Sequence, residues 1–318
     1  MNVLIADKFE AAGIEQLQVA GCKVTQDPDL SGDTLVATVG RTGCNILIVR
    51  STRVTPDVID AAGELKLIIR AGAGYDTIDT AAAAAKGIRV ANCPGMNSTA
   101  VAELAMGLII ALDRRIVHNA VDLRAGIWHK KEYGKARGLK GRTLGIVGLG
   151  RIGVLLARRA RAFEMNLIYC DVVANETAER ELGIRKVKMD TLLRESDFVS
   201  LHTPGGEETK HLLSTEQFAL MKPAACVINC SRGGVVDEQA LAQAIASGRI
   251  RGAGLDVYEI EPGASDREFS DPVVKADMVY GTHHIGASTE QAQLAVAEET
   301  VRIVKTFKET GEVLNCVN

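Results

Sequence analysis

Short apolar runs alternate with helical patterns along almost the whole chain, and they fall into two successive series. In the first series the runs are residues 3–6, 23–25, 46–49, 67–70 and 88–91. In the second series they are residues 144–147, 167–170, 198–201, 227–229, 254–257 and 278–280. Strands that alternate with helices assemble into parallel sheets covered by those helices. The pattern therefore predicts an α/β protein with two doubly wound parallel-sheet domains.

Two longer segments have apolar residues at helical spacing. Residues 98–115 follow the first series and precede the second, so this helix is predicted to link the two domains. Residues 289–310 follow the last strand of the second series. Periodicity does not decide which of the two sheets this C-terminal helix covers.

Length and charge narrow the possible partners. The 318 residues are enough for about two domains of ordinary size. A net charge of −3 without a sustained basic face argues against a nucleic-acid partner, because neutralising phosphates requires clustered Lys and Arg. There is no run of about 20 apolar residues, so a membrane partner is not expected. Met1 leads directly into a strand-like run, and we expect no signal peptide.

The seven cysteines are odd in number and scattered along the chain. This usage does not predict a disulfide framework, and it indicates a reducing compartment, so we expect a cytoplasmic protein. The chain also lacks a compact set of Cys and His residues with the spacing of metal ligands. The sequence therefore predicts no metal site, and a zinc alcohol dehydrogenase is not expected.

The glycines at Gly148, Gly150 and Gly153 stand between a predicted strand and a predicted helix. The first glycine of such a motif permits the tight turn, the second lets backbone amides approach a pyrophosphate, and the third allows close packing of the helix. Asp171 follows about 20 residues later, at the end of the next predicted strand. A carboxylate there accepts hydrogen bonds from a ribose and repels a 2′-phosphate, so the sequence predicts a Rossmann-type domain that binds NAD rather than NADP.

Polar residues follow each predicted strand of the second series. They are Gly148, Asp171, His202–Pro204, Cys230–Gly234, Asp256 and His283–His284. Each has an ordinary structural explanation when taken alone. Because ligands of open α/β sheets bind at the carboxyl ends of the strands, the whole set predicts a binding site at that edge.

Four motifs together resemble a known family. They are Gly148–Gly153, Asn229–Gly234, Leu255–Pro262 and His284–Thr289, and the similarity extends over nearly the whole chain. The sequence is similar to the D-isomer-specific 2-hydroxyacid dehydrogenases, and most similar to their phosphoglycerate dehydrogenase branch. The resemblance implies hydride transfer between NAD and C2 of a D-2-hydroxy acid. The expected substrate pair is 3-phosphoglycerate and 3-phosphohydroxypyruvate, in serine biosynthesis.

The resemblance implies that Arg232, Glu261 and His284 are the catalytic residues. The planar fork of Arg232 would hold the carboxylate and keto oxygen of the substrate. His284 would exchange the hydroxyl proton, and Glu261 would orient its ring and stabilise the protonated form. His283 stands where the family usually has proline, which leaves two adjacent histidines as candidates. The following Ile285-Gly286 favours His284.

The same matching implies further contacts with the cofactor and the substrate. Cofactor contacts are expected at Gly148, Gly150, Arg151, Ile152, Gly153, Asp171, Thr203, Cys230, Ser231, Asp256, Gly286 and Ala287. Substrate contacts are expected at Arg53, Gly72, Ala73, Gly74 and Arg232. A substrate phosphate needs cations at the far end from Arg232, and the candidates are Arg53, Arg70, Lys130 and Lys131. Ordinary surface charge explains each of these cations equally well.

The family also implies the domain boundaries. A flavodoxin-like substrate domain is expected to comprise residues 1–97 and 286–318, with a Rossmann-type NAD-binding domain at 98–285. The family forms homodimers through the cofactor domain. The charged segment 115–137, which holds the only tryptophan, would be either an arm that crosses to the partner subunit or a mobile surface loop. Because the sequence stops at Asn318, we expect no C-terminal regulatory domain.

Two other functions remain open at this point. A hydroxypyruvate or glyoxylate reductase would use the same chemistry on an unphosphorylated acid. A NAD-sensing, corepressor-like binding protein would keep the fold without turnover. The retained Arg232, Glu261 and His284 argue against the second of these.

Overall fold

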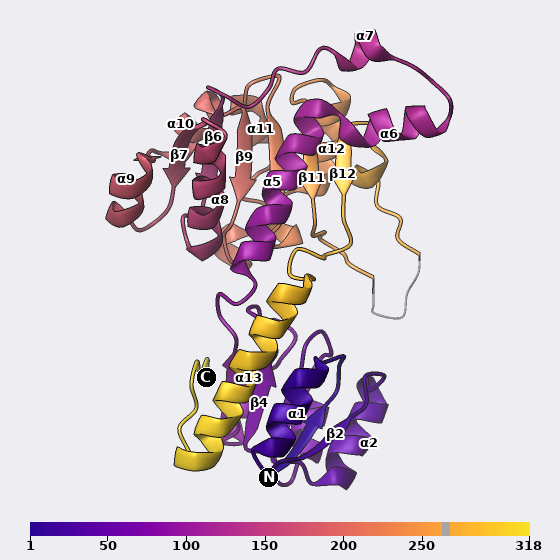
Figure 1. Cartoon of the computed structure of the whole chain (residues 1–318), viewed down its shortest axis with the longest axis vertical. Coiled ribbons are helices and arrows are strands. Elements are labelled where there is room, and N and C mark those ends of the chain that lie inside the picture. The colour runs from indigo at the N-terminus through magenta and orange to yellow at the C-terminus, as the bar shows by residue number, and fades with distance from the viewer. Residues whose placement is uncertain (263–267) are drawn as a thin grey trace. The chain divides into compact units, whose positions relative to one another are not determined.

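A computed structural model describes residues 1–262 and 268–318 of the chain (Figure 1). The chain divides into two compact units. The first unit comprises Met1–Asn97 and Ala287–Asn318, and the second comprises Ser98–Gly286. Each unit is built on one sheet, and the pairings within both sheets are parallel. The predicted fold class, two parallel-sheet α/β domains, is confirmed.

The first unit has a five-stranded sheet in the order β2-β1-β3-β4-β5, which is the flavodoxin-like order. Its strands are β1 (Asn2–Ile5), β2 (Lys23–Gln26), β3 (Ile46–Val49), β4 (Leu67–Arg70) and β5 (Arg89–Asn92). Its helices are α1 (Ala11–Val19), α2 (Gly32–Thr42), α3 (Pro56–Ala61), α4 (Thr80–Ala85) and α13 (Glu290–Thr310). Successive residues of β1 point to opposite faces, so Leu4 packs in the core beneath α2 to α4 while Val3 and Ile5 pack in the other core.

The C-terminal helix α13 completes the second of these cores. Its residues Val301, Ile303 and Val304 are buried beside strand residues of the five-stranded sheet. Thr289 caps the helix by accepting a hydrogen bond from the Ala292 amide at 3.2 Å. In Figure 1, α13 in yellow lies beside α1 in indigo, with which it packs. The periodicity of this helix left its partner open, and the structure places it on the first sheet.

The second unit has a seven-stranded sheet in the order β12-β11-β10-β9-β6-β7-β8, a Rossmann-type order with one added strand. The strands are β6 (Thr143–Val147), β7 (Asn166–Cys170), β8 (Arg185–Lys186), β9 (Phe198–Leu201), β10 (Cys226–Asn229), β11 (Gly252–Leu255) and β12 (Val279–Gly281). The helices are α5 (Ser98–Arg114), α6 (Ile116–Arg124), α7 (Lys130–Tyr133), α8 (Arg151–Ala162), α9 (Glu176–Leu182), α10 (Met189–Glu195), α11 (Thr215–Leu220) and α12 (Glu238–Ala246). Short 3₁₀ turns are η1 (Glu207–Thr209), η2 (Gly233–Val235) and η3 (Val273–Lys275).

Two apolar cores lie on opposite faces of this sheet. Helices α5 and α8 cover one face, where Leu144 and Ile146 of β6 are fully buried. Helices α10 to α12 contribute to the other core, which includes Val147. Because all seven strands run in the same direction, their carboxyl ends lie along one edge of the sheet. Within the described residues, none of the helices is both long enough and apolar enough to cross a membrane.

Candidate active site

The turn after β6 has the geometry of a phosphate-binding loop. Gly148 has φ of +89°, and a Cβ there would lie 2.7 Å from the carbonyl oxygen of His202. A Cβ at Gly153 would lie 2.4 Å from the carbonyl oxygen of Gly148, so the close approach of α8 to the turn requires glycine. By contrast, apart from its neighbours along the chain, no described atom lies within 4 Å of the Cβ position at Gly150. The space above the first turn of α8 is therefore open, and Arg151 and Ile152 form that turn.

Asp171 follows β7 directly and is hydrogen-bonded to the glycine-rich turn. Its Oδ2 accepts from the Leu149 amide at 2.7 Å, and its Oδ1 accepts from the Val173 amide at 3.3 Å. Asp171 also lines a cavity of about 430 Å³ together with Leu149 and residues 173–177. The lining contains a second acid, Glu176, and the described residues that line it include no Lys or Arg. A ribose 2′-phosphate in this cavity would lie beside two carboxylates.

We expect Asp171→Ala to weaken NADH binding about 10-fold and to reduce the preference for NADH over NADPH, because hydrogen bonds to a charged group are worth about 1.5–3 kcal/mol. Dissociation constants from fluorescence titration of both cofactors measure this effect. Asp171→Asn is the matched control, since its amide oxygen can still accept from the Leu149 amide while the charge is removed. If the ratio of the two dissociation constants is unchanged in both variants, Asp171 does not contact the ribose.

The residues after β9 and β10 stand at the same edge. Thr203 Oγ1 and His202 Nδ1 are buried polar atoms without a hydrogen-bond partner in the described part of the chain. Loss of solvent lowers the pKa of His202 to about 4, so its ring is neutral near pH 7. Ser231 is buried, and its hydroxyl donates to Asn229 Oδ1 at 2.8 Å. Burial raises the pKa of the Cys230 thiol, which is therefore an inert, uncharged wall of the site.

Arg232 extends from the turn that follows β10. The side chain of Asn229 holds this turn, since its Nδ2 donates to the Arg232 carbonyl at 2.8 Å. Arg232 Nη1 donates to the Ser231 carbonyl at 2.8 Å, and its aliphatic stem lies against Gly205. The guanidinium is close enough for its charge to act on both Glu261 and His284. The structure thus brings together the three side chains that the sequence assigned to catalysis.

Glu261 and His284 form a hydrogen-bonded pair, with His284 Nδ1 at 2.7 Å from Glu261 Oε2. This bond raises the pKa of His284 above its ordinary value, against the opposing effect of burial. Burial is the largest influence on the pKa of Glu261 and raises it, but the bond to His284, the charges of His284 and Arg232 and the Tyr258 amide together outweigh burial, so the pKa of this carboxyl is lowered. The pair is therefore an anionic carboxylate beside an imidazole that holds its proton more firmly. Of the two adjacent histidines, His284 is the one that makes this bond.

Asp256 fixes the backbone on which His284 stands. Its Oδ1 accepts from the Thr282 hydroxyl at 2.6 Å and from the Ile285 amide at 2.8 Å, and its Oδ2 accepts from the Gly286 amide at 2.8 Å. Between these contacts, His284 has φ of +51°, in the left-handed region that a residue with a side chain rarely adopts. Asp256 is 2% exposed. The sequence placed this residue beside the cofactor but missed its role in holding the histidine loop.

The predicted substrate residues of the first unit stand after β3 and β4. Arg53 is exposed and follows a backbone turn that Asp7 stabilises, because Asp7 Oδ2 accepts from the Arg50 amide at 2.6 Å and from the Thr52 amide at 3.2 Å. Sequence reasoning did not single out Asp7. Its position directly after the strand-like residues 3–6 was an available signal.

The Gly72–Gly74 segment follows β4. The guanidinium of Arg70 lies against Gly72, so closely that a Cβ at this position would collide with it. The Ala73 carbonyl accepts from Asn92 Nδ2 at 2.6 Å. Side-chain contacts therefore hold this backbone segment at the carboxyl end of its strand. Ala287, which was predicted to contact the cofactor, also belongs to the first unit.

Lys130 and Lys131 lie elsewhere in the second unit. They are exposed on α7, whose Glu132 and Tyr133 line a cavity of about 420 Å³ with Arg251 and Met278. Arg251 and Met278 directly precede β11 and β12, so this cavity is at the amino edge of the sheet. Within the chain, the two lysines are therefore not brought to the edge that carries Arg232 and His284.

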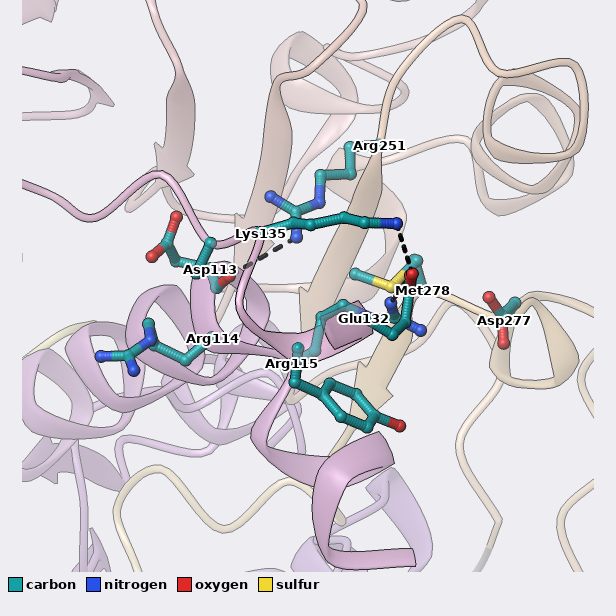
Figure 2. Close-up of a pocket in the computed structure, with 10 residues that line it drawn as sticks. Asp113, Arg114, Arg115, Glu132, Lys135, Arg251, Asp277 and Met278 are labelled. Carbon is teal, nitrogen blue, oxygen red and sulfur yellow. Dashed lines mark hydrogen bonds and ion pairs between the residues drawn. The ribbon is translucent and has the colours of Figure 1, made fainter. Parts of the chain in front are cut away.

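Charged groups pair with one another across this second cavity (Figure 2). Glu132 Oε1 accepts from Arg115 Nη1 at 2.7 Å, and Glu132 Oε2 accepts from Lys135 Nζ at 2.5 Å. Arg251 Nη2 donates to the main-chain oxygen of Asp113 at 3.5 Å. The Arg115–Glu132 pair attaches α7 to the residue that follows α5, and Arg251 joins the start of β11 to the end of α5. These contacts explain Arg115, Lys135 and Arg251 as structural groups.

The comparison with family models decides the identity of the fold and site. The model of the D-isomer specific 2-hydroxyacid dehydrogenase NAD binding domain matches residues 106–286. The chain belongs to this family. A hydroxypyruvate reductase from Thermotoga maritima is 46% identical to this 2-hydroxyacid dehydrogenase over 268 residues, which are 84% of this chain and 85% of that relative.

Other relatives differ in their names and lengths. A D-3-phosphoglycerate dehydrogenase from Methanocaldococcus jannaschii is 41% identical over 312 residues. The alignment covers 96% of this chain but only 58% of that relative, so the chain spans little more than half of its length. The solved structure of a glyoxylate reductase from Paecilomyes thermophila is similar, with a TM-score of 0.87 and 29% identity over 100% of this chain and 98% of that one.

The cofactor of this dehydrogenase is NAD, as the matched domain model indicates. The residues present fit a dinucleotide on two observations. The space above Gly150 at the start of α8 is open. Thr203 Oγ1 is a buried polar atom at the same edge, for which the described residues supply no partner. A cofactor group that hydrogen-bonds to this oxygen would remove that deficit.

Proposed function

We propose that this dehydrogenase interconverts 3-phosphoglycerate and 3-phosphohydroxypyruvate and thereby serves serine biosynthesis. The observation that carries the proposed chemistry is the 2.7 Å contact between His284 Nδ1 and Glu261 Oε2, with the charge of Arg232 acting on both. A histidine held by a carboxylate next to a guanidinium suits proton exchange at the C2 oxygen of an acid. NAD, when bound, supplies the hydride acceptor or donor.

Each of the three side chains has a defined task in this proposal. Arg232 binds the substrate carboxylate and C2 oxygen with its planar fork, which fixes C2 for hydride transfer. His284 uses its Nε2, since its Nδ1 is occupied by Glu261, to take the hydroxyl proton during oxidation and to return it during reduction. Glu261 stabilises the imidazolium that forms during oxidation, because its negative charge lies against the ring.

The phosphorylated substrate is the finer part of the proposal. Arg53 supports it as an exposed cation after β3, at the strand end where ligands of parallel sheets bind. The relatives divide between phosphoglycerate dehydrogenase and hydroxypyruvate reductase. The 46% identity to the reductase over 85% of its length favours hydroxypyruvate or glyoxylate as the second candidate substrate.

Oxidation of NADH by the purified protein against 3-phosphohydroxypyruvate, hydroxypyruvate, glyoxylate and pyruvate tests the substrate. We expect kcat/KM for the phosphorylated acid to exceed the others at least about 10-fold, since a charge-assisted contact to phosphate is worth about 1.5–3 kcal/mol. Arg53→Ala should remove most of this preference and leave kcat/KM for hydroxypyruvate nearly unchanged. Arg41→Ala, a substitution in the last turn of α2, is the matched control.

Three outcomes separate the candidates. A preference for hydroxypyruvate or glyoxylate that Arg53→Ala leaves unchanged would contradict the phosphorylated substrate and support the reductase. Absence of turnover on all four acids, with NADH still bound, would support a NAD-sensing binding protein. Loss of activity on all acids in Arg53→Ala would contradict a role limited to phosphate.

We also propose a homodimer formed through the second unit, in a reducing cytoplasm. Helix α6 and the segment that follows it expose several large apolar side chains, which are Ile116, Val117, Val121, Leu123, Ile127 and Trp128. Apolar residues gathered in this way on one segment are typical of a protein interface. The seven cysteines are free, which supports the proposed compartment.

A further inference from the structure

Glu238 is a buried acid that the reaction described above does not use. It is the first residue of α12, and this helix begins shortly after the turn that carries Arg232. Glu238 is only 7% exposed. Carboxyl groups are rarely buried to this extent unless specific partners compensate for lost solvation.

The partners of Glu238 lie on the segment that carries Glu261. Glu238 Oε1 accepts from the backbone amide of Glu259 at 2.9 Å. The carboxylate of Glu259 is itself held by His211, whose Nε2 lies 2.6 Å from its Oε1. Two residues further on, Glu261 Oε1 accepts from the Tyr258 amide at 3.2 Å. Glu238 therefore holds the short segment from which Glu261 reaches His284.

The same segment lies directly on the turn of Arg232. A Cβ at Gly233 would lie 1.9 Å from both the carbonyl carbon and the carbonyl oxygen of Tyr258. Glycine is thus required for the two backbones to touch. Glu238 follows this turn in sequence and bonds to Glu259 on the other side of the contact. Its hydrogen bond fixes the turn of Arg232 and the segment of Glu261 to each other.

A second carboxyl group, that of Asp271, lies close enough to Glu238 to act on it by charge and by hydrogen bonding. Two carboxyl groups can share a hydrogen bond only if one of them carries a proton. Burial raises the pKa of Glu238 to about 8; the amide of Glu259 opposes this rise, and the negative charges of Asp271 and Glu259 add to it. Tyr258 also faces this cluster, and His211 lies behind Glu259.

We propose that Glu238 is a positioning residue for the Glu261–His284 pair and that it acts as a neutral carboxylic acid. It donates to Asp271 and at the same time accepts from the Glu259 amide. When Glu238 ionises, two carboxylates face each other in a buried cluster, and their repulsion displaces the segment that ends in Glu261. The inference rests on the proposed function of Glu261 and His284.

The pH dependence of hydroxy-acid oxidation tests the proposal. In this direction His284 is the base, so its own deprotonation makes activity rise with pH, and a fall at higher pH has another source. We expect kcat of the wild type to fall above about pH 8, the value at which Glu238 ionises. The substrate is 3-phosphoglycerate, or glycerate if the panel above shows that hydroxypyruvate is preferred.

Two substitutions of Glu238 have different expected effects on kcat. Glu238→Gln keeps one donor and one acceptor, so kcat at pH 7.5 should stay within about twofold of the wild type and the fall above pH 8 should disappear. Glu238→Ala should lower kcat at pH 7.5 about 10-fold with KM for NAD nearly unchanged, because the substitution alters the position of Glu261 relative to Arg232 and leaves the glycine-rich turn after β6 intact. Glu216→Gln, an exposed residue of α11, is the control for the change in charge.

Infrared spectroscopy of the protein gives a readout that does not depend on turnover. At pH 7 the carbonyl band of a protonated carboxyl group should be present in the wild type and in Glu216→Gln and absent in Glu238→Gln. This arm remains informative if Glu238→Ala does not fold.

Two results would overturn the role of Glu238. One is a fall above pH 8 that persists in Glu238→Gln, and the other is a loss at pH 7.5 in Glu238→Gln as large as in Glu238→Ala. Failure of the proposed function would instead be seen as full turnover by His284→Asn, which does not involve Glu238.

Discussion

Replacement of His284 by asparagine should lower kcat about 10³-fold and leave NADH binding within about twofold, since general acid–base catalysis contributes about 10²–10⁴-fold. Asparagine can still hydrogen-bond to Glu261, but it cannot take or return a proton near pH 7. It also tolerates the left-handed backbone of this position, where φ is +51°. Steady-state reduction of the preferred acid gives kcat, and fluorescence titration gives the NADH affinity.

His283→Asn is the matched control, because it changes the same ring at the adjacent position. His283 is exposed, and the bond to Glu261 is made by His284. We therefore expect kcat of His283→Asn to remain within about threefold of the wild type. If His283→Asn abolishes turnover and His284→Asn has a mild effect, the assignment of the acid/base residue is wrong.

Asp256→Ala should have the second largest effect, on both stability and turnover. The substitution leaves the Thr282 hydroxyl and the amides of Ile285 and Gly286 without their acceptor. A buried donor that loses its partner costs about 1–3 kcal/mol, so we expect a loss of about 3 kcal/mol in the free energy of unfolding. Because these contacts hold His284 in its left-handed conformation, kcat should also fall about 10²-fold.

Denaturant unfolding and steady-state kinetics of the same samples measure both effects. Asp190→Asn, at an exposed position in the first turn of α10, removes one negative charge as well and should change stability by less than about 0.5 kcal/mol. An Asp256→Ala protein that is as stable and as active as Asp190→Asn would contradict the role of Asp256 in holding the His284 loop. Normal stability with weakened NAD binding would instead indicate that Asp256 contacts the cofactor and does not hold the His284 loop.

The sequence predicted the sheets well because most strands are buried on both faces and form continuous apolar runs. Ten of the eleven predicted strands coincide with observed ones to within one residue at each end, as at β4, where residues 67–70 match Leu67–Arg70. The remaining strand, predicted at 254–257, is observed at Gly252–Leu255. The glycines at its start have no side chains and so add nothing to the apolar pattern from which the strand was predicted. The two-residue strand β8 was missed, since Arg185 and Lys186 are exposed and carry no apolar signal.

The site was predictable only in part, for a related reason. Polar residues after strands, such as Arg232 and Asp171, are identified by position, because parallel strands end at one edge. The partners of a side chain depend on how the loops fold back, which a strand pattern does not contain. The hydrogen bonds of Asp256 to the His284 loop and the contact of Glu238 with Glu259 are of this kind. Lys130 and Lys131 illustrate the same limit. The sequence shows that they are charged, but it does not show at which edge of the sheet they lie.

The position of α13 in the core of the first unit determines the order in which the two units can fold while the protein is being synthesised. Residues 98–286 form the second unit as one continuous stretch, and this unit can fold as soon as that stretch has left the ribosome. The five-stranded sheet is synthesised earlier, but α1 covers only part of one of its faces until Val301, Ile303 and Val304 emerge. Residues 1–97 are therefore the last part of the chain to reach the native state, although they are made first, and during translation their apolar face is the surface that chaperones must protect from aggregation.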